Sequence, residues 1–236
     1  MRNFCFIFTF LQFLVLPAMS QDTTLPILPT SDFEINGQGD HEAWNQTEWV
    51  TLTLNHGPSS DLKTQAKVLY SETGLYFLMQ CEDETLTATL TEDFTNLFNE
   101  DVVEVFLWPE EKYPIYFEYE LSPLNYELPI LIPNLKESFY GWRPWHYEGE
   151  RRTRHATSVQ GGKKESMASV SGWTAEFFIP YALLNPLENV PPKAGTRWRA
   201  NLYRIDYDAG EPRYWQWQPT SGSFHEYQKF GTFAFQ

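Results

Sequence analysis

Acidic side chains occur in pairs along this sequence, and a pair of carboxylates can act as the acid and base of a glycosidase. Glu104 with Glu118 forms one such pair, and Asp206 with Asp208 forms another. Hydrolysis of a glycosidic bond needs a controlled separation of the two groups and one raised pKa. The alternative, which we favour, is that these acids accept hydrogen bonds from sugar hydroxyls or pair with arginines such as Arg204.

Aromatic residues supply the other half of a sugar site. Residues 139–147 hold five aromatic rings and a histidine together with Gly141 and Pro144, a composition that predicts a loop. Flat apolar rings cover the C–H face of a pyranose, while polar groups at the rim bond its hydroxyls. Trp142 and Trp145 are therefore candidate sugar-binding residues. The alternative is that these rings fold back as a lid over one end of the domain.

Candidate metal ligands are few. The five histidines include no closely spaced pair, so we expect no transition-metal site. Acidic residues crowd the turn around residues 35–37, and carboxylate oxygens of this kind can hold calcium. Asp40 is the calcium candidate, and a solvated acidic turn without a cofactor is the alternative. The acidic residues of this turn are Asp32, Glu34, Asp40 and Glu42.

The charge of the chain narrows the classes of partner. Its 236 residues include 17 Lys and Arg against 31 Asp and Glu, a formal net charge of -14. This balance argues against nucleic acid and against an anionic membrane surface, and it favours a neutral or cationic partner. The motifs of zinc proteases, α/β-hydrolases, P-loop proteins and EF-hands are all missing from the sequence.

The first twenty residues predict a secretory signal peptide. Arg2 precedes an apolar run shorter than a membrane span, which disfavours the alternative of a membrane anchor, and a small-x-small sequence ends at Ser20. We therefore expect residues 1–20 to be cleaved, residues 21–31 to form a linker and residues 32–236 to form one domain. Cleavage implies a secreted or periplasmic protein with no membrane span. No cysteine directly follows the cleavage point, so no lipid anchor is expected.

Short β-rich runs separated by turn residues predict an all-β protein, a single antiparallel β-sandwich with immunoglobulin-like or jelly-roll-like layering. A hairpin is predicted at residues 71–74, because Gly74 can take the positive φ of a tight turn. One or two short helical turns are expected, at residues 91–98 and 180–184. The predicted strands span residues 49–54, 66–70, 75–81, 102–108, 115–121, 153–160, 167–170, 173–179, 198–206, 213–217 and 230–235.

Alternation along a strand divides its side chains between two faces. One side of residues 102–108 is aliphatic, which leaves Glu104 on the opposite side among aromatic residues. On the next predicted strand, Glu118 and Glu120 share a side with an aromatic residue. One face of these two neighbouring strands is therefore expected to combine carboxylates with aromatic rings. Arg204 on a later strand could supply a basic partner.

A set of short motifs extends in order over almost the whole mature chain. They are Ile35-Asn36-Gly37 with Ala43-Trp44, Ala66-Lys67-Val68-Leu69-Tyr70 with Gly74-Leu75-Tyr76, Asp83, Asp101-Val102-Val103-Glu104-Val105-Phe106, Gly172-Trp173-Thr174-Ala175-Glu176 with Ile179-Pro180, Trp198-Arg199-Ala200-Asn201 with Arg204-Ile205-Asp206, and Phe230-Gly231-Thr232. In this order the motifs resemble the family 9 carbohydrate-binding modules of the DOMON-like β-sandwich superfamily. The resemblance implies a single β-sandwich that binds sugars, often chain ends, without catalysis. Some members of the family carry structural calcium.

The resemblance also implies a set of site residues. In the sugar-binding members two aromatic rings clamp the sugar, and their positions hold Phe98 and Phe224 here, where the family pattern has Trp. Glu104 matches the acid that accepts hydrogen bonds from sugar hydroxyls. Ser221 stands in the place of a polar loop ligand, usually an amide. The resemblance therefore predicts non-catalytic binding of a poly- or oligosaccharide at these residues.

The sequence departs from the family where the family carries an arginine on the strand after Glu104. Acids stand there instead, and Glu118 is the candidate ligand among them. The departure indicates a different sugar, or the substitution of that arginine by Arg204 or Arg143.

Other functions stay open beside sugar binding. The resemblance extends to haem-binding relatives in the wider superfamily, where axial Met, His or Lys side chains hold iron, and Met79, Met167 and His155 are the candidates here. A second alternative function is hydrolysis of a glycosidic bond by a carboxylate pair that contains Glu104. A further alternative is an accessory module that interacts with other polysaccharide-processing proteins.

Overall fold

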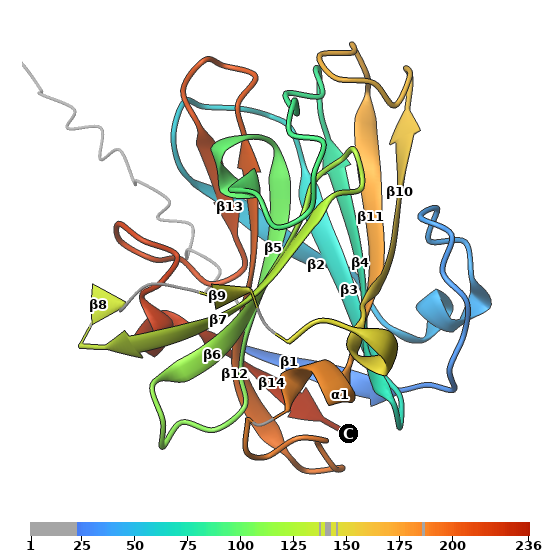
Figure 1. The fold of residues 1–236 in the computed structure, drawn as a ribbon. Helices are drawn as coiled ribbons and strands as arrows, with labels where there is room; N and C mark the ends of the chain where they lie inside the picture. The colour runs from blue at the N-terminus through green and yellow to red at the C-terminus, as the bar shows by residue number, and fades with distance from the viewer. Residues whose placement is uncertain (1–22, 137, 140–142, 145, 186) are drawn as a thin grey trace, which may run out of the picture.

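Fourteen strands dominate the part of the chain that the computed structural model describes, which is residues 23–136, 138–139, 143–144, 146–185 and 187–236 (Figure 1). The strands are β1 (Thr24–Pro29), β2 (Val50–His56), β3 (Thr64–Tyr70), β4 (Gly74–Glu82), β5 (Val102–Trp108), β6 (Ile115–Leu121), β7 (Glu127–Leu135), β8 (Ser138–Phe139), β9 (Arg143–Pro144), β10 (Arg154–Gln160), β11 (Gly172–Pro180), β12 (Arg197–Asp206), β13 (Arg213–Gln216) and β14 (Gly231–Phe235). The helical elements are η1 (Glu42–Gln46), η2 (Leu97–Asn99), η3 (Gly149–Arg151), α1 (Tyr181–Leu184) and η4 (Tyr227–Lys229). The all-β prediction is confirmed.

The strands form two layers that face each other (Figure 1). The first layer, which we call the site sheet, runs β14-β12-β5-β6-β7, with β13 beside the end of β12. The second layer, the back sheet, runs β10-β11-β4-β3. Two strands join the layers, because β1 pairs with both β14 and β3, and β2 pairs with both β13 and β3. Among the described strand pairs, those of β1 are parallel, whereas the strands of each layer run antiparallel.

The main core fills the space between the two sheets. Val103, Val105 and Leu107 of β5 are fully buried in it, opposite aromatic side chains of the back sheet such as Phe77 and Phe177. Each side chain of this kind contributes about 1.5–3 kcal/mol when it is removed from water. The aliphatic side predicted for residues 102–108 is therefore the inner face of β5. The other side of β5, which carries the carboxylate of Glu104, faces outward.

The outer face of the site sheet is also lined with aromatic side chains. Phe106, Tyr116, Tyr203 and Phe230 belong to a second apolar cluster there, and each is buried. This cluster forms because residues of the segment before β14 pack over the outer face: Phe224 stacks on Tyr203 of β12, and Phe230 contacts Phe106 of β5 and Tyr116 of β6. The site described below lies on this face.

The prediction of a linker over residues 21–31 is wrong for β1. Its two prolines and its threonine are typical of a linker, but Ile27 is fully buried and the strand pairs with β14 and then with β3. Each neighbour pairs with only part of β1, so the missing proline N–H groups are tolerated. The strand therefore belongs to the sandwich.

Two further differences between the predicted and the observed strands have local causes. The strand predicted at residues 167–170 is reduced to one bridge between Thr85 and Ser169, because Met167 has a φ of 59° and interrupts the extended chain. Conversely, the sequence does not predict β7. Pro129 and Pro133 interrupt its pattern, yet they fit because β7 lies near the end of the site sheet, beside only the short strands β8 and β9 on its outer side.

The hairpin at residues 71–74 is confirmed, but its glycine is needed for another reason than the predicted one. Ser71 donates its backbone N–H to the carbonyl of Gly74 at 2.9 Å, and β3 and β4 pair in register around the turn. Gly74 is not among the residues with positive φ. A Cβ at this position would lie 2.4 Å from the carbonyl oxygen of Ile179 and 2.4 Å from the ring of Phe178. Close approach of β11, rather than turn conformation, therefore requires glycine.

Candidate functional site

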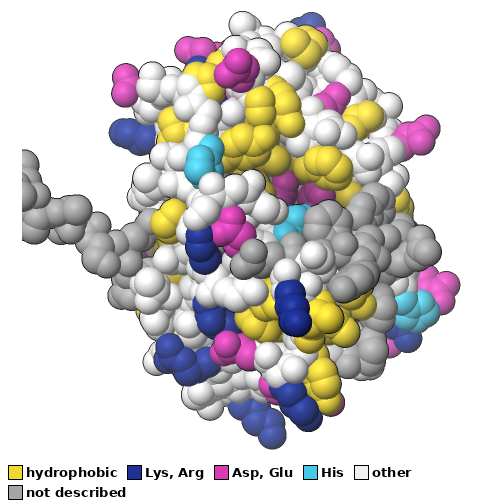
Figure 2. Space-filling model, turned by 90° about the vertical axis from the view of Figure 1, so that its left-hand side faces the viewer, with side chains coloured by type: hydrophobic (Ala, Val, Ile, Leu, Met, Phe, Trp, Pro, Cys, Tyr) yellow, Lys and Arg dark blue, Asp and Glu magenta, His cyan; other side chains and the backbone are white. Residues whose placement is uncertain are grey.

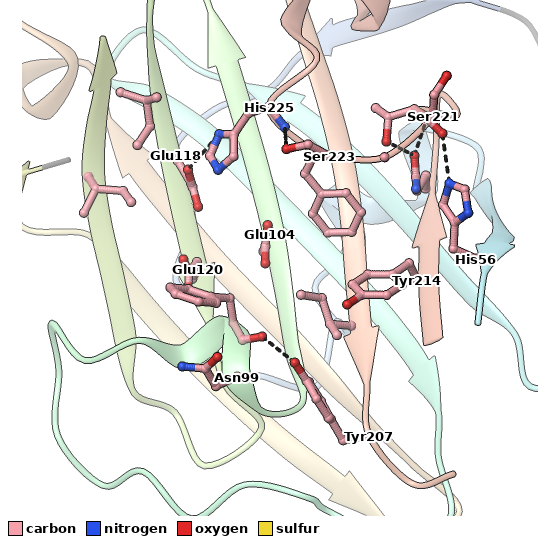
Figure 3. A pocket seen from close by; sticks show the side chains of 18 residues that line it. His56, Asn99, Glu104, Glu118, Glu120, Tyr207, Tyr214, Ser221, Ser223 and His225 are labelled. Atoms are coloured by element: carbon pink, nitrogen blue, oxygen red, sulfur yellow. Dashed lines mark hydrogen bonds and ion pairs between the residues drawn. The ribbon is translucent and has the colours of Figure 1, made fainter. Parts of the chain in front are cut away.

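A pocket with a volume of about 570 Å³ opens on the outer face of the site sheet. Side chains of β2, β5, β6, β7, β12 and β13 line it, together with η2 and the loop of residues 220–225 (Figure 3). Figure 2 shows acidic side chains at the bottom of a hollow on this side of the molecule, bordered by hydrophobic ones. The face that combines carboxylates with aromatic rings, predicted from alternation, is therefore the inside of this pocket.

Three glutamates from two adjacent strands share the pocket. Glu104 of β5 and Glu118 and Glu120 of β6 are 2%, 4% and 0% exposed. Glu104 and Glu120 are direct partners in the antiparallel register of β5 and β6. Like charges placed opposite each other repel, so ionisation of one carboxyl group opposes ionisation of the next.

The same crowding shifts the acidity of the three groups. Burial raises the pKa of Glu118 to about 8. Burial, reinforced by the neighbouring carboxylates, holds the pKa of Glu104 and of Glu120 well above the usual range. Oε2 of Glu118 and both carboxylate oxygens of Glu120 have no hydrogen-bond partner among the described residues. Buried polar atoms without partners are rare in folded proteins and call for an explanation.

Aromatic rings border the carboxylates. Phe98 of η2 is 37% exposed, and its carbonyl oxygen accepts a hydrogen bond from the Tyr207 hydroxyl at 3.0 Å. Phe224 stacks on Tyr203 with 3.9 Å between ring centroids, and the edge of Tyr214 meets it at 5.5 Å. Phe98, Phe224, Tyr207 and Tyr214 all line the pocket, so the pocket offers apolar ring surface next to its acidic groups.

The loop that carries Ser221 and Phe224 is folded around one carboxylate. The backbone N–H groups of Ser221, Gly222 and Ser223 donate to Glu226, and Lys229 forms an ion pair with it at 2.6 Å. The hydrogen bond from Lys229 and the three from the backbone lower the pKa of Glu226 to about 2. The loop is therefore held by a carboxylate that stays ionised.

Neutral polar groups complete the lining. Burial lowers the pKa of His225 to about 4, so its ring is neutral at pH 7, and its Nδ1 lies 2.8 Å from the Tyr116 hydroxyl. The side-chain carbonyl of Gln216 accepts from the backbone and the hydroxyl of Thr220, at 2.6 and 3.0 Å. Nε2 of Gln216 is buried and without a hydrogen-bond partner, so it is a donor available beside the pocket.

The structure brings five of the predicted site residues into this one pocket: Phe98, Glu104, Glu118, Ser221 and Phe224. Their role in sugar binding stays a prediction. Trp142 and Trp145 lie outside the described residues, and the side chain of Arg143 does too.

Arg204 does not substitute for the missing arginine of the family. Its side chain is fully buried on the inner side of β12, where Nη2 lies 2.6 Å from Asp206 and 3.1 Å from Asp83, and the guanidinium packs over Trp215. Adjacent residues of a strand point to opposite faces, and Ile205 is the neighbour that lines the pocket. A basic partner for the glutamates is therefore not supplied by Arg204.

Several lining residues are not predicted from the sequence. Glu120 could have been included, because it is two positions from Glu118 and shares its side of β6. Tyr207, Tyr214 and Gln216 carry no local signal, because the pairing of β12 with β13 brings them to the pocket.

The acidic turn that holds the calcium candidate Asp40 does not have the geometry of a calcium site. Asp40 is exposed and accepts a hydrogen bond from the Asn36 side chain at 2.9 Å. The centre of the turn is organised by Glu176 of β11, which accepts from the backbone N–H of Asn36 and Gly37 and from the indole of Trp44. The acids of this turn therefore do not fit a calcium ion.

One group of carboxylates elsewhere is close enough to hold a cation. Oxygens of Asp83, Asp206 and Asp208 lie within 4.8 Å of one another. The guanidinium of Arg204 already contacts two of these carboxylates, so a protein cation supplies the positive charge there. Asp208 in turn accepts from the backbone of Thr85 at 3.0 Å. The arrangement therefore fits a structural ion-pair network.

The haem candidates do not form a site in the described residues. Met79 is fully buried in the main core, whereas Met167 is 56% exposed. His155 is engaged by Asn125 at 3.1 Å and by Glu127 at 3.4 Å. None of the three lines the pocket. The structure gives no support for haem binding.

Comparison with known proteins agrees with this architecture. A candidate carbohydrate-binding protein from Bacteroides uniformis is similar in structure, with a TM-score of 0.71 and 16% identity over 90% of this chain and 99% of that chain. Two structures of a family 9 carbohydrate-binding module from Caldicellulosiruptor kristjanssonii are also similar. The complex with cellotriose has a TM-score of 0.64 and 15% identity, covering 90% of this chain and 93% of that one, and the complex with glucose has 0.61 and 16%, covering 90% and 96%.

At these identities the structural likeness shows the fold. Among curated proteins, no sequence matches the chain. The sequence profile of the family described as carbohydrate family 9 binding domain-like matches residues 35–235, which is most of the chain. This chain therefore belongs to the carbohydrate family 9 binding domain-like family.

Proposed function

We propose that the pocket on the site sheet binds a carbohydrate without chemical conversion. The observation that carries the proposal is the arrangement of buried carboxylates beneath exposed and half-buried aromatic rings in one cavity of about 570 Å³. Rings cover the apolar face of a pyranose, and carboxylates accept hydrogen bonds from its hydroxyls. Family membership and the sugar complexes of the Caldicellulosiruptor kristjanssonii module support the same function.

In this proposal the predicted residues divide between stacking on the sugar ring and hydrogen bonding to its hydroxyls. Phe98 and Phe224 stack on the sugar ring, and Glu104 accepts from its hydroxyls. Glu118 and Ser221 are further polar ligands at the floor and the rim. Trp142 and Trp145 remain predicted contributors from outside the described residues.

The acidity of the carboxylates supports binding rather than hydrolysis. A glycosidase holds its two carboxyl groups in environments that push their pKa values apart, so that one is an acid and the other is ionised. Here burial raises the pKa of Glu104, Glu118 and Glu120 in the same direction. Each carboxyl group is therefore held toward its neutral form, whereas a glycosidase needs one carboxylate held ionised.

We also propose that residues 1–20 direct the protein to a secreted or periplasmic location. Within the described residues, no helix has the length and apolar character needed to cross a membrane. N-terminal sequencing of the exported protein tests the cleavage and is expected to begin at Gln21; an uncleaved terminus contradicts it. At that location the protein would meet other polysaccharide-processing proteins, and we propose them as interaction partners on this ground alone.

The sugar proposal is tested by calorimetry with mono- and oligosaccharides on the full chain and on two variants. Phe224→Ala removes a ring and Glu104→Ala removes an acceptor, and each is expected to abolish saturable binding while the circular dichroism spectrum stays unchanged. Tyr113→Ala is the matched aromatic control, because Tyr113 is 40% exposed and does not line the pocket. Normal affinity in both pocket variants contradicts the site assignment.

A further inference from the structure

The titratable side chains that line the pocket in the described part of the chain are three glutamates, two tyrosines and two histidines. None of the 18 side chains that line it in the described part of the chain is a lysine or an arginine. Lys229 contacts Ser221 at the rim, but its ammonium forms an ion pair with Glu226 at 2.6 Å. The His225 ring is neutral at pH 7. Three glutamates therefore share the pocket without a cation from the protein.

The other buried glutamates of the described residues, Glu127 and Glu176, accept several hydrogen bonds each, unlike the glutamates of the pocket. Glu176 is 1% exposed, and its carboxylate accepts from two backbone N–H groups and from the Trp44 indole. Glu127 is fully buried and accepts from Tyr119, Tyr147 and Thr153. The fold thus provides donors for its structural carboxylates. No described donor lies within hydrogen-bond distance of either oxygen of Glu120 or of Oε2 of Glu118. The His225 ring is near Oε2 of Glu118, but its Nδ1 is 3.9 Å away.

The unpartnered oxygens point to the chemistry of the missing donor. A sugar hydroxyl is neutral and donates one hydrogen, whereas a protonated amine donates three and carries a positive charge. Figure 3 shows the side chains of Glu104, Glu118 and Glu120 extending from adjacent strands into the same space. One ammonium group placed among them can satisfy several acceptors and neutralise their mutual repulsion.

We propose that the ligand of this pocket is an amino sugar, a pyranose with a free protonated amine such as a 2-amino-2-deoxyhexose or its β-linked oligomers. This inference rests on the proposed function, because it names the class of carbohydrate. The pyranose ring packs against Phe98 and Phe224, and the ammonium lies among the glutamates. Tyr207 and Tyr214 border the same space, and aromatic faces attract cations as well. A sugar carboxylate or sulfate offers these oxygens no hydrogen-bond donor and repels any glutamate that is ionised, so acidic sugars are expected to bind weakest.

The experiment is isothermal titration calorimetry of the full chain at pH 7 with glucosamine, N-acetylglucosamine, glucose and glucuronate. We expect glucosamine to bind at least about tenfold more tightly than N-acetylglucosamine, because acetylation removes the charge and hydrogen bonds to charged groups are the stronger ones. Glucuronate is expected to bind weakest. Repeating the titration in buffers of different ionisation enthalpy is expected to reveal release of protons with glucosamine and none with glucose, because the ammonium favours the ionised carboxylates.

Variants separate the charge from the shape of the pocket. Glu120→Gln keeps the size of the side chain and is expected to reduce the preference for glucosamine over N-acetylglucosamine to below about threefold. Glu118→Gln serves the same purpose if the first variant fails to fold. The exposed Glu72→Gln is the matched control, and its preference is expected to equal that of the native protein.

The outcomes distinguish the two proposals. If glucose or N-acetylglucosamine binds as tightly as glucosamine, the amino-sugar inference is wrong and carbohydrate binding stands. If none of the sugars nor their oligomers binds, both are wrong. If methylamine binds as tightly as glucosamine, the pocket recognises an amine alone and the assignment to a sugar fails.

Discussion

Replacing Glu118 by glutamine is expected to stabilise the ligand-free protein in alkaline solution and to leave it nearly unchanged in acid. Burial raises the pKa of this carboxyl group from 4.5 to about 8. Between these two values the folded state holds a proton that the unfolded state has released. Native stability therefore falls as the pH rises through this window, and a glutamine at the same position removes that dependence.

The magnitude follows from the size of the shift. Ionising a group whose pKa has moved from 4.5 to about 8 costs the folded state about 5 kcal/mol once the pH exceeds both values. Water entering the open pocket offsets part of this cost, so we expect Glu118→Gln to gain about 2–4 kcal/mol at pH 8.5. At pH 5 the folded carboxyl group is neutral, like the amide, and partial ionisation in the unfolded state contributes only about 0.8 kcal/mol, so the difference is expected to be within about 1 kcal/mol.

The assay is urea unfolding followed by tryptophan fluorescence at pH 5, 6, 7 and 8.5. Trp173, Trp198, Trp215 and Trp217 are all buried, so unfolding exposes them to water. The exposed Glu72→Gln is the control for the removal of one negative charge. A stability difference between native protein and Glu118→Gln that is the same at every pH would refute the reasoning, because it would mean that the folded protein does not protonate this group.

Two further predictions concern the framework that holds the site. Arg204→Ala leaves Asp83 and Asp206 buried without their cation and is expected to lower the free energy of unfolding in urea by about 3–5 kcal/mol. Arg197→Ala, at an exposed position of the same strand, is the control and is expected to change it little. Equal effects of the two substitutions would mean that the buried ion pairs contribute nothing. Gly74→Ala forces a Cβ to within 2.4 Å of the Ile179 carbonyl and is expected to lower the melting temperature by several degrees, corresponding to about 1–3 kcal/mol. Gly222→Ala is its control, because the nearest atom there is 3.8 Å away, and a loss as large in this variant would show that close approach is not the cause.

Alternation predicts the parts of the site that lie within single strands. Glu104 and Glu118 fall on outward faces because their neighbours on either side are needed in the core, so period two alone identifies their side of the sheet. The family resemblance adds Phe98 and Phe224, which lie in irregular segments where no periodicity applies. Sequence therefore predicts this half of the pocket well.

The remainder of the pocket depends on pairing between distant segments. His56 of β2 and Tyr214 of β13 come together because β13 pairs with both β12 and β2, a partnership between strands more than 150 residues apart. No local pattern encodes that choice. Similarly, β1 and β7 escape prediction because tertiary packing accepts prolines that local propensity rejects.

The carboxylate of Glu226 orders the loop of residues 221–223, and this order affects the affinity of the pocket for its ligand. Three backbone N–H groups and Lys229 fix Glu226, so the segment leading to Phe224 is ordered before any ligand arrives. A ligand that meets a mobile loop loses part of its binding free energy to the conformational entropy of that loop. Here the loop loses its conformational entropy when the protein folds, so even a single sugar ring can bind with little reorganisation of the protein. We therefore expect the association rate to be limited by diffusional encounter rather than by closure of the loop.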